Sequence, residues 1–419
     1  MSVHSLRGFR DLLPADAALF AGIEAAAREV FALYGYQELR IPTIELKELF
    51  VKSTGDTTDI VEKEMYAFTD GGGREVAVRP EGTPGMVRAY IEQNLSQTGR
   101  NAKYFYMGSM FRAERPQAGR YREFEQIDVE HIGNAAPFAD AETIAMLVKL
   151  LEKVGVEGCS VEINSLGCAE CRKVYRETLL AYLRLNAATL CEPCKGRIER
   201  NPLRALDCKT DGPALAEKAP KLALCPACAE HFARTQQLLT MAGVNYKVNP
   251  SLVRGLDYYT RTVFEVKTTA LGSQDAVAAG GRYDDLVKSM GGPAAPAIGW
   301  GMGVDRVAML LKDKLAIDGS PKTFIVSASA DAQDQAFRLL AALRAAGISA
   351  DSSNLTLSLK SQMRSADKSG AAFALIIGED EVKAGTVTVK PLKEKGEQFT
   401  VPVSDAPAKI KELLERKNL

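Results

Sequence analysis

The eight cysteines of this 419-residue chain are confined to one short segment, from Cys159 to Cys228. The N-terminus, MSVHSLRGFRDLLP, has no apolar targeting core, so the chain is expected to stay in the cytoplasm, where cysteines remain reduced. Reduced cysteines in C-x-x-C pairs favour metal binding over disulfides. The pairs are Cys168/Cys171, Cys191/Cys194 and Cys225/Cys228, and Cys208 stands alone in the sequence LDCK.

Two of these pairs have the spacing of a structural zinc site with four thiolate ligands. The alternative is a helical segment whose cysteines are reduced and bind no metal. The predicted ligands are Cys191, Cys194, Cys225 and Cys228, with Cys168/Cys171 or Cys208 as substitutes for one pair.

The cysteine-rich segment divides the chain. Its pattern from residue 167 to 243 is mostly helical, whereas strand signals precede it and resume at Val244. After the polar connection Lys314–Lys322, strands and helices alternate over about 95 residues, which predicts a compact α/β domain. We therefore predict a core in two parts, residues 1–166 and 244–318, an inserted helical segment, residues 167–243, and a C-terminal domain, residues 322–419.

Hydrophobic periodicity predicts the elements of each part. The strands Tyr104–Arg112 and Tyr121–Ile132 flank a polar loop and form a hairpin. Pro42 interrupts the run Gln37–Ile44 and places it at an edge or an interface. The other expected elements are helices over Pro14–Tyr34, Ala139–Val154 and Val304–Lys312, strands over Met65–Thr69, Glu75–Arg79, Val244–Val248, Tyr259–Lys267, Gln274–Ala279 and Ala297–Gly303, and, in the C-terminal domain, strands Thr323–Ser327, Ser349–Asp351, Ala372–Gly378, Thr386–Lys390 and Gln398–Pro402 with helices Ala332–Ala346, Ser358–Ser369 and Ala406–Lys417.

Composition excludes several classes of protein. The 53 basic side chains balance 53 acidic ones, so any phosphate binding must come from local basic groups. Three histidines are too few for a multi-histidine metal site and nearly exclude a Ser-His-Asp triad. The longest charge-free run, Ser289–Val304, is broken by prolines and glycines and is too short for a transmembrane helix. The sequence contains no GxxxxGK[ST] phosphate loop and no complete GxGxxG after a strand.

The hairpin sequence FRAERPQAGRYREFEQIDVE is rich in arginine. Guanidinium groups make planar, multidentate contacts with phosphate oxygens, and lysine does not reproduce that geometry. Tyr121 and Phe124 offer ring faces on which a base can stack. The alternative is an exposed, salt-bridged hairpin. The arginines are Arg112, Arg115, Arg120 and Arg122.

Three carboxylates, Glu81, Asp128 and Glu130, lie beside apolar runs and close in sequence to Thr83 and Gln126. A carboxylate combined with a hydroxyl and an amide can hold an ammonium group through charge-assisted hydrogen bonds. Taken singly, each of these carboxylates is more typical of a surface acid.

Two further segments carry an arginine beside aromatic or glycine residues. RGLDYYTRTVFE begins with Arg254 and enters a strand. Alternation along that strand predicts Tyr259 and Arg261 on one face and Tyr258 on the other, and core packing of the tyrosines is the alternative. In GWGMGVDR the glycines allow close backbone approach before Arg306, at the start of a helix, and a tightly packed turn is the alternative.

Together these segments resemble the bacterial type of histidyl-tRNA synthetase, a family of class II aminoacyl-tRNA synthetases. The resemblance covers most of residues 6–310, and the residues after 322 resemble the family's anticodon-binding domain. RGLDYY and GGRYD are specific to the histidyl enzymes within the class, whereas the cysteine-rich insertion departs from many family members. The matching segments are RGFRDLLP, RIPTIE, VEKEMYAF, RPEGT, FRAERPQAGRYREFEQ, NPLRALDCK, LVRGLDYYTRTVFE, AGGRYDDL and GMGVDR.

The resemblance implies a mixed α/β (α+β) fold: a catalytic core built on an antiparallel sheet with helices, the helical insertion and a C-terminal α/β anticodon-binding domain. It also implies a reaction. ATP, with Mg²⁺, activates L-histidine to histidyl-adenylate, and the histidyl group then moves to the 3′ end of tRNA(His), releasing AMP and pyrophosphate. The family implies a cytoplasmic homodimer with no membrane partner, whose interface includes the segment with Pro42.

The resemblance also implies roles for individual residues. Arg112 and Arg254 are the catalytic residues, one on each side of the α-phosphate of ATP. Arg120 and Arg306 bind the outer phosphates, and Phe124 stacks on the adenine. The residues implied for histidine are Glu81, Gly82, Thr83, Gln126, Glu130, Tyr258 and Tyr259, and those implied for the tRNA acceptor end are Arg115 and Gln117.

Two other functions remain as alternatives. One is a synthetase-like regulatory subunit of ATP phosphoribosyltransferase, which would lack the C-terminal domain and carry eroded motifs. The other is a sensor of uncharged tRNA, which would not require the intact set Arg112, Arg254 and Arg306.

Overall fold

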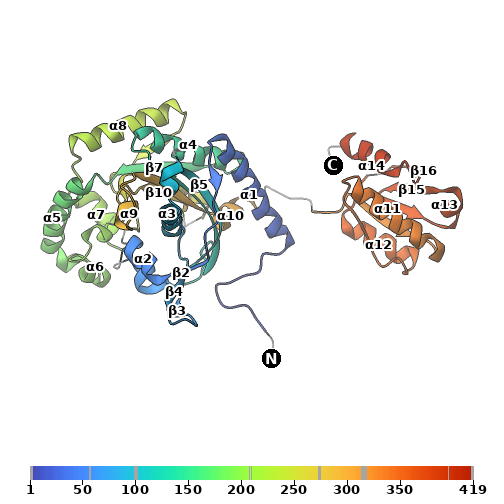
Figure 1. Ribbon diagram of the computed structural model, residues 1–419, viewed down its shortest axis with the longest axis horizontal. Coiled ribbons are helices and arrows are strands. Elements are labelled where there is room, and N and C mark those ends of the chain that lie inside the picture. Colours follow the sequence, from blue (N-terminus) through green and yellow to red (C-terminus); the bar gives the residue numbers. More distant parts are fainter. Residues whose placement is uncertain are drawn as a thin grey trace. The chain divides into compact units, whose positions relative to one another are not determined.

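The computed structural model describes residues 3–55, 58–98, 102–206, 208, 210–271, 275–312, 319–394 and 396–416. The chain divides into two compact units, Met1–Ala316 and Ile317–Leu419 (Figure 1). Most of the predicted connection 314–322, like Gln274 at the start of one predicted strand, lies outside the described residues. Among the helices of the described residues, none has the length and apolar character needed to cross a membrane.

A large sheet organises the first unit. Within the described residues it has eight strands in the order β1-β5-β6-β11-β10-β9-β7-β8. The pairs at its two edges, β1-β5 and β7-β8, are parallel and the inner pairs are antiparallel, which confirms the expected sheet. The strands are β1 (Gln37–Glu38), β5 (Ala102–Phe111), β6 (Glu123–Ile132), β7 (Cys159–Ser165), β8 (Tyr246–Val248), β9 (Thr260–Thr268), β10 (Ala276–Arg282) and β11 (Ala297–Gly303).

One face of this sheet holds the main core and is covered by two long helices and one short helix. Ile127 and Val129 of β6 point into that core, together with Trp300 of β11. Apolar residues at helical spacing on three helices cover these strand residues, which is why the helices pack on this face. The helices are α1 (Pro14–Leu33), α4 (Pro137–Lys153) and α10 (Val304–Leu311), and α8 (Pro226–Met241) packs against α4.

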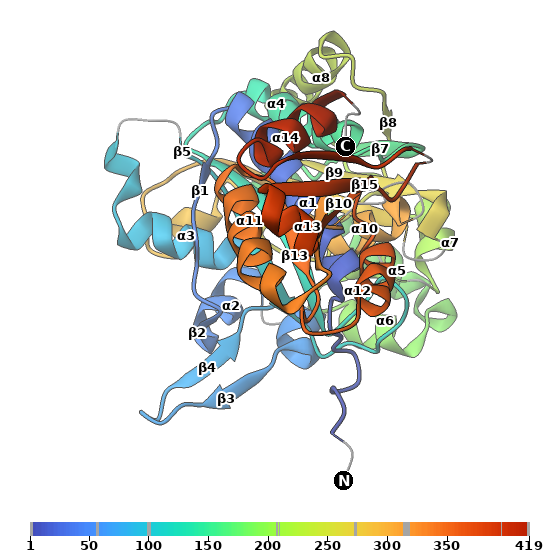
Figure 2. The same ribbon diagram turned by 90° about the vertical axis from the view of Figure 1, so that its right-hand side faces the viewer.

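The opposite face carries polar side chains and shorter helices. Because side chains alternate along a strand, Gln126, Asp128 and Glu130 of β6 point to this face. Figure 2 shows that a small antiparallel sheet, β2-β4-β3, extends from the same unit. The elements here are α2 (Lys47–Thr54), α3 (Thr83–Glu92) and α9 (Leu286–Ser289), and the small sheet contains β2 (Ile44–Leu46), β3 (Ala67–Thr69) and β4 (Glu75–Val78).

The chain between β7 and β8 is helical. It begins with α5 (Ala169–Leu185), continues through α6 (Glu192–Arg197) and α7 (Gly212–Lys218), and returns through α8. Leu179 and Leu183 of α5 pack with residues of α6 and α7 in a separate small core.

The second unit is an α/β domain, as its alternating pattern predicted. Its sheet has the order β13-β12-β14-β15-β16, with β12 parallel to both of its neighbours. The sequence pattern missed α13 (Glu379–Ala384), because no side chain of that helix is buried and its apolar periodicity is weak. The other elements are β12 (Thr323–Ser327), α11 (Gln333–Ala345), β13 (Ala350–Ser352), α12 (Leu359–Ser369), β14 (Phe373–Ile377), β15 (Thr386–Pro391), β16 (Phe399–Pro402) and α14 (Ala406–Arg416).

The run Gln37–Ile44 is not one strand. β1 ends at Glu38 and β2 begins at Ile44, and the two belong to different sheets. Pro42 lies between them, where its missing N–H removes no ladder hydrogen bond.

A buried ion pair joins α4 to the sheet. Asp140 of α4 accepts a hydrogen bond from Nε of Arg282 at 2.6 Å and another from Oγ1 of Thr262 at 2.5 Å. Its other neighbour is Nε2 of His231 on α8, at 2.8 Å. Asp140 and Arg282 are both 0% exposed, and Arg282 also donates to two backbone carbonyls. Arg282 also forms an ion pair with Asp284 at 2.9 Å, so removing Asp140 would leave the buried guanidinium with one of its two counter-charges.

We expect Asp140→Asn to lower the free energy of unfolding of the first unit by about 1.5–3 kcal/mol, because the buried Arg282 loses a charge-assisted hydrogen bond and one of its two counter-charges. The matched control is Glu29→Gln, in the exposed pair of Glu29 and Lys153 at 2.7 Å, which should cost at most about 1 kcal/mol. The single tryptophan, Trp300, is buried in this unit and reports unfolding by fluorescence in denaturant. Equal losses in the two variants would contradict the assignment.

Candidate active site

A cavity of about 300 Å³ opens on the polar face of the large sheet. Its walls come from β6, β9, β10 and β11, from the start of α3 and α10, and from the loop between β5 and β6. Most of the residues that the sequence analysis assigned to ATP and histidine meet here. Those that line the cavity are Glu81, Thr83, Arg112, Arg120, Phe124, Gln126, Arg254, Tyr258, Tyr259 and Arg306.

The glycines of GWGMGVDR make room for the polar side chains of β6. Gly299 is paired with Glu130 and Gly301 with Asp128 in the register of β11 on β6. A Cβ atom on Gly299 would overlap the Glu130 carboxylate, and one on Gly301 would overlap the side chains of Gln126 and Asp128. The absence of side chains at these glycines therefore leaves space for the carboxylates of β6. The sequence alone does not show that β6 is the neighbouring strand.

Glu130 accepts hydrogen bonds from two uncharged hydroxyl groups. Its Oε1 accepts a bond of 2.7 Å from Oγ1 of Thr83, and its Oε2 accepts one from the hydroxyl of Tyr283. Glu130 is 1% exposed, and burial raises the pKa of its carboxyl to about 8. Gly82, which precedes Thr83, lies against the Tyr106 hydroxyl, where a larger residue would not fit.

Two more acids line the cavity itself. Glu81 accepts hydrogen bonds from Oγ1 of Thr54 at 2.7 Å and from the hydroxyl of Tyr258 at 3.0 Å, and burial raises the pKa of its carboxyl. Asp128 accepts a bond of 2.5 Å from the amide of Gln126, and burial raises the pKa of Asp128 to about 7. These carboxyl groups thus offer acceptors for a cationic or N–H-rich group.

The tyrosines do not follow the alternation that the sequence predicted. β9 begins only at Thr260, and Arg261 has a φ of 48°, so the backbone is not a regular strand through this segment. Tyr258 and Tyr259 therefore both line the cavity, with ring centroids 4.8 Å apart. Burial raises the pKa of Tyr259 to about 12, which keeps its hydroxyl a hydrogen-bond donor.

Three arginines, Arg112, Arg120 and Arg306, also line the cavity, and the charges of the first two act on the third. Nε of Arg112 donates to the Pro80 carbonyl at 2.8 Å, and its guanidinium lies 5.3 Å from the centre of the Phe124 ring. Arg306 donates to the Gly119 carbonyl at 3.2 Å. Burial lowers the pKa of Arg306, and the nearby charges of Arg120 and Arg112 lower it further. Cations that destabilise one another in this way favour an anionic ligand.

Arg254 is paired with an acid of the same cavity. Its Nη1 donates to Oε1 of Glu265 at 2.8 Å, and both side chains line the cavity. The insertion supports this segment, because Nη1 of Arg172 donates to the carbonyl of Tyr259 at 3.0 Å and Arg204 donates to the carbonyl of Gly255.

Four predicted residues are not among the residues that line the cavity in the described part of the chain. Glu130 is hydrogen-bonded to the lining residues Thr83 and Tyr283, and Gly82 stands in the chain beside lining residues. Arg115 and Gln117 are exposed on the loop between β5 and β6.

The cavity also includes residues to which the sequence analysis gave no role. Two of them are Tyr283, which stands in the motif GGRYDDL, and Glu265, which ends RTVFE, so both could have been found from quoted motifs. Thr54 gave no signal in the sequence; it does not line the cavity but donates a hydrogen bond to Glu81, which does.

The cysteines form two groups among the described residues, and neither is the predicted set. In one, Cys225 and Cys228 meet Cys168 and Cys171, as the predicted substitution of one pair allows. In the other, Cys191 and Cys194 meet Cys208 and Asp211. The single site of Cys191, Cys194, Cys225 and Cys228 is therefore wrong, because spacing along the chain does not reveal which pairs the helices bring together.

Comparisons with known proteins agree with this geometry. The sequence model of the histidyl-tRNA synthetase family matches residues 8–307, and that of an anticodon binding domain matches residues 322–413. A histidine–tRNA ligase of Elusimicrobium minutum is 52% identical over 97% of this chain and 98% of its own.

Solved structures show the same likeness. The histidyl-tRNA synthetase of S. aureus has a TM-score of 0.84 and 32% identity, covering 98% of this chain and 100% of its own. A Bacillus halodurans protein described as an ATP phosphoribosyltransferase regulatory subunit/histidyl-tRNA synthetase shares the fold, with a TM-score of 0.64 and 21% identity over 90% of this chain and 98% of its own. Because the family model spans most of the chain and relatives match it nearly end to end, the chain belongs to the histidyl-tRNA synthetase family.

Proposed function

We propose that the chain is a histidine–tRNA ligase in which one cavity performs both the activation of L-histidine by ATP and the transfer of the histidyl group to tRNA(His). The observation that supports this most directly is that one cavity brings together two buried acids, Glu81 and Asp128, and the arginines Arg112, Arg120 and Arg306, with Arg112 close enough for its charge to act on both acids. A ligand with a cationic amino acid end and a polyphosphate end matches both the acids and the arginines.

The acids form the histidine site. Glu81, with Thr83 and Gln126, binds the α-ammonium group, and Gly82 leaves space at the start of α3. Glu130 and Tyr259 read the imidazole, which presents a donor on one nitrogen and an acceptor on the other when neutral. The hydroxyl of Tyr258, bonded to Glu81, fixes that carboxylate in place.

The arginines form the ATP site. Arg112 binds the α-phosphate, Arg120 and Arg306 bind the outer phosphates, and Phe124 stacks on the adenine, with Mg²⁺ arriving as part of the ATP substrate. The histidine carboxylate attacks the α-phosphorus, the bond to pyrophosphate breaks, and histidyl-adenylate forms. No protein nucleophile is required, so positioning and charge stabilisation supply the catalysis.

Transfer then needs the tRNA. Arg115 and Gln117, exposed on the loop between β5 and β6, approach the acceptor end, and the terminal hydroxyl of the tRNA attacks the histidyl carbonyl so that AMP leaves. The C-terminal domain, residues 322–419, binds the anticodon. The catalytic core comprises residues 1–166 and 244–318, and the insertion 167–243 supports the Arg254 segment. The enzyme is a cytoplasmic homodimer with Pro42 at its interface.

The two alternative functions are less well supported. A regulatory subunit of ATP phosphoribosyltransferase needs neither an anticodon-binding domain nor an ATP-binding set of arginines, and this chain has both the domain match and the arginines. A sensor of uncharged tRNA needs no catalytic arginine on the second side of the α-phosphate, whereas this chain has Arg254 in the cavity lining.

Amino acid-dependent exchange of ATP with pyrophosphate tests the function itself. We expect exchange with histidine and background rates with the other nineteen amino acids, because no other side chain presents the donor and the acceptor of an imidazole to Glu130 and Tyr259. Absence of exchange with histidine, despite histidine binding, would favour a regulatory subunit or a sensor.

Arg254→Ala is expected to lower the single-turnover rate of adenylate formation by about 10²–10³-fold at saturating ATP and histidine, because a fixed guanidinium stabilises charge that develops in the transition state. Arg254→Lys should restore little of that rate, since a point charge does not replace the planar fork. Arg234→Ala, at an exposed position on α8, is the matched control. A near-normal rate in a folded Arg254→Ala protein would leave Arg254 only a structural partner of Glu265.

The raised pKa of Glu130, about 8, predicts a pH dependence of histidine binding. Below pH 8 the free enzyme holds a proton on Glu130, and a carboxylate that accepts the imidazole N–H must lose it. The Michaelis constant for histidine should therefore rise as pH falls from 8.5 to 7, by up to about tenfold per pH unit for one proton. Glu130→Gln should flatten this profile, whereas Glu123→Gln, on the same strand but outside the cavity lining, should retain it.

Calorimetry provides the second readout for Glu130. At pH 7, histidine binding should release a proton, which is detected by comparing buffers with different enthalpies of ionisation. Binding without proton release in the wild-type protein would contradict the ionised state of Glu130 in the complex.

A further inference from the structure

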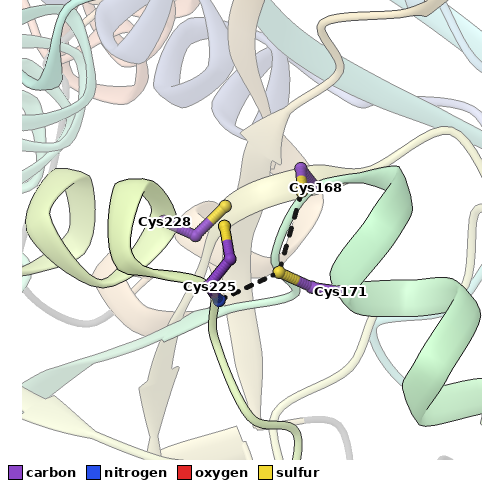
Figure 3. A group of neighbouring side chains, drawn as sticks. All are labelled: Cys168, Cys171, Cys225 and Cys228. Carbon is purple, nitrogen blue, oxygen red and sulfur yellow. Dashed lines mark hydrogen bonds between the residues drawn. The ribbon is translucent and has the colours of Figure 1, made fainter.

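The seven grouped cysteines and Asp211 are not used by the proposed reaction, and their geometry indicates a separate function. In each group the candidate ligand atoms all lie within 4.8 Å of one another. Figure 3 shows Cys168, Cys171, Cys225 and Cys228 converging from two segments that are far apart in the sequence.

The sulfur spacing matches one small tetrahedral ion. Zn–S bonds of about 2.3 Å place the sulfurs of a tetrahedral site about 3.8 Å apart. Sγ of Cys168 lies 3.7 Å from Sγ of Cys171, and Sγ of Cys191 lies 3.6 Å from Sγ of Cys208. A four-iron cluster stands between its cysteines and needs a wider opening, and sulfurs at these distances are not bonded to one another.

The backbone around the first group supports thiolates. Cys168 is the N-cap residue of α5 and Cys225 is the N-cap residue of α8, so each C-x-x-C pair lies on the first turn of a long helix. Helix N-termini stabilise negative charge. The backbone N–H of Cys225 also donates to Sγ of Cys171 at 3.2 Å, a bond that a metal-bound thiolate accepts.

The second group has an independent geometry. Cys191 and Cys194 begin α6, while Cys208 and Asp211 precede α7. The Asp211 carboxylate accepts from the backbone N–H of Cys191 at 3.0 Å, which fixes its orientation toward the sulfurs. Carboxylate oxygen is an established zinc ligand beside thiolates.

The segment between these groups needs such cross-links. α6 and α7 are short helices of 6 and 7 residues, below the length at which isolated helices are stable. Their shared core with α5 is small, and small cores of this kind are usually completed by a metal or a disulfide.

We propose that the insertion binds two structural zinc ions, one held by Cys168, Cys171, Cys225 and Cys228 where the insertion leaves and rejoins the core, and one held by Cys191, Cys194, Cys208 and Asp211 within the insertion. The first ion closes the base of the insertion. Cys171 is followed by Arg172, whose guanidinium donates to the carbonyl of Tyr259, so the same ion fixes the start of α5 that supports the cavity wall.

Zinc content tests both sites in the full-length protein. Protein purified with reductant and without chelator should contain about two zinc ions per chain by elemental analysis, and Cys228→Ser or Cys194→Ser should each remove about one. Cys159→Ser is the matched control and should retain both, because among the described residues Cys159 is the cysteine outside either group. Replacement of zinc by cobalt(II) should give the visible absorption of a tetrahedral thiolate complex.

Each outcome decides one site. Zinc content unchanged by Cys228→Ser overturns the first site, and zinc content unchanged by Cys194→Ser overturns the second. Wild-type protein without zinc, protein with iron instead, or a loss in Cys159→Ser as well, overturns both. If a variant does not fold, chelation of the wild-type protein replaces it: the melting temperature should fall on chelation and recover with added zinc, because metal binding energy is folding energy.

Discussion

Side chains alternate between the two faces of a strand, and β6 places Ile127 and Val129 in the apolar core while it directs Asp128 and Glu130 toward the cavity. A register shift of one residue would bury the acids against the helices and expose the apolar residues. The pairing of Glu130 with Gly299 prevents such a shift, since only a glycine accommodates the carboxylate at that point. The same pairing register of β6 and β11 is therefore required both for the apolar core and for the polar site.

The same burial determines the electrostatics of the cavity. Desolvation raises the pKa of the carboxyl groups of Glu81, Asp128 and Glu130 and lowers the pKa of Arg306. In the free protein the charged forms of these buried side chains are therefore less stable than they would be in water. A ligand that brings a positive charge to the acids and negative charges to the arginines recovers that free energy. Desolvated charges of both signs are consistent with a site that binds an amino acid and a nucleotide side by side.

Local sequence patterns predicted the helices, the strands and the short motifs. They did not predict which distant segments come into contact. The hairpin around Arg112 and the glycine-rich strand before Arg306 could be recognised because their chemistry is contained in one short segment. Tyr283 stands in a recognisable motif, but its hydrogen bond to Glu130 could not be predicted, since the two residues are far apart along the chain. The cysteine groups failed for the same reason, because the spacing of each pair is local but their pairing depends on how α5 and α8 meet.

The segment that carries both tyrosines shows how the insertion and the sheet share one irregularity. Arg261 adopts a left-handed φ of 48°, which costs a non-glycine residue roughly 1–3 kcal/mol and persists only where the surroundings fix it. Here its N–H donates to the Gly167 carbonyl at 2.9 Å and its carbonyl accepts from the N–H of Leu166 at 2.7 Å.

The pairing of β10 with β9 shifts register beside Arg261, as at a β-bulge, and bulges turn the side chains next to them. That turn allows Tyr258 to reach Glu81 while Tyr259 remains in the cavity wall. The backbone that holds Arg261 in this conformation, Leu166 and Gly167, leads directly into Cys168. The orientation of the two tyrosines is therefore fixed by the backbone at the base of the insertion. Through this backbone the cysteine-rich segment is physically connected to the proposed histidine site.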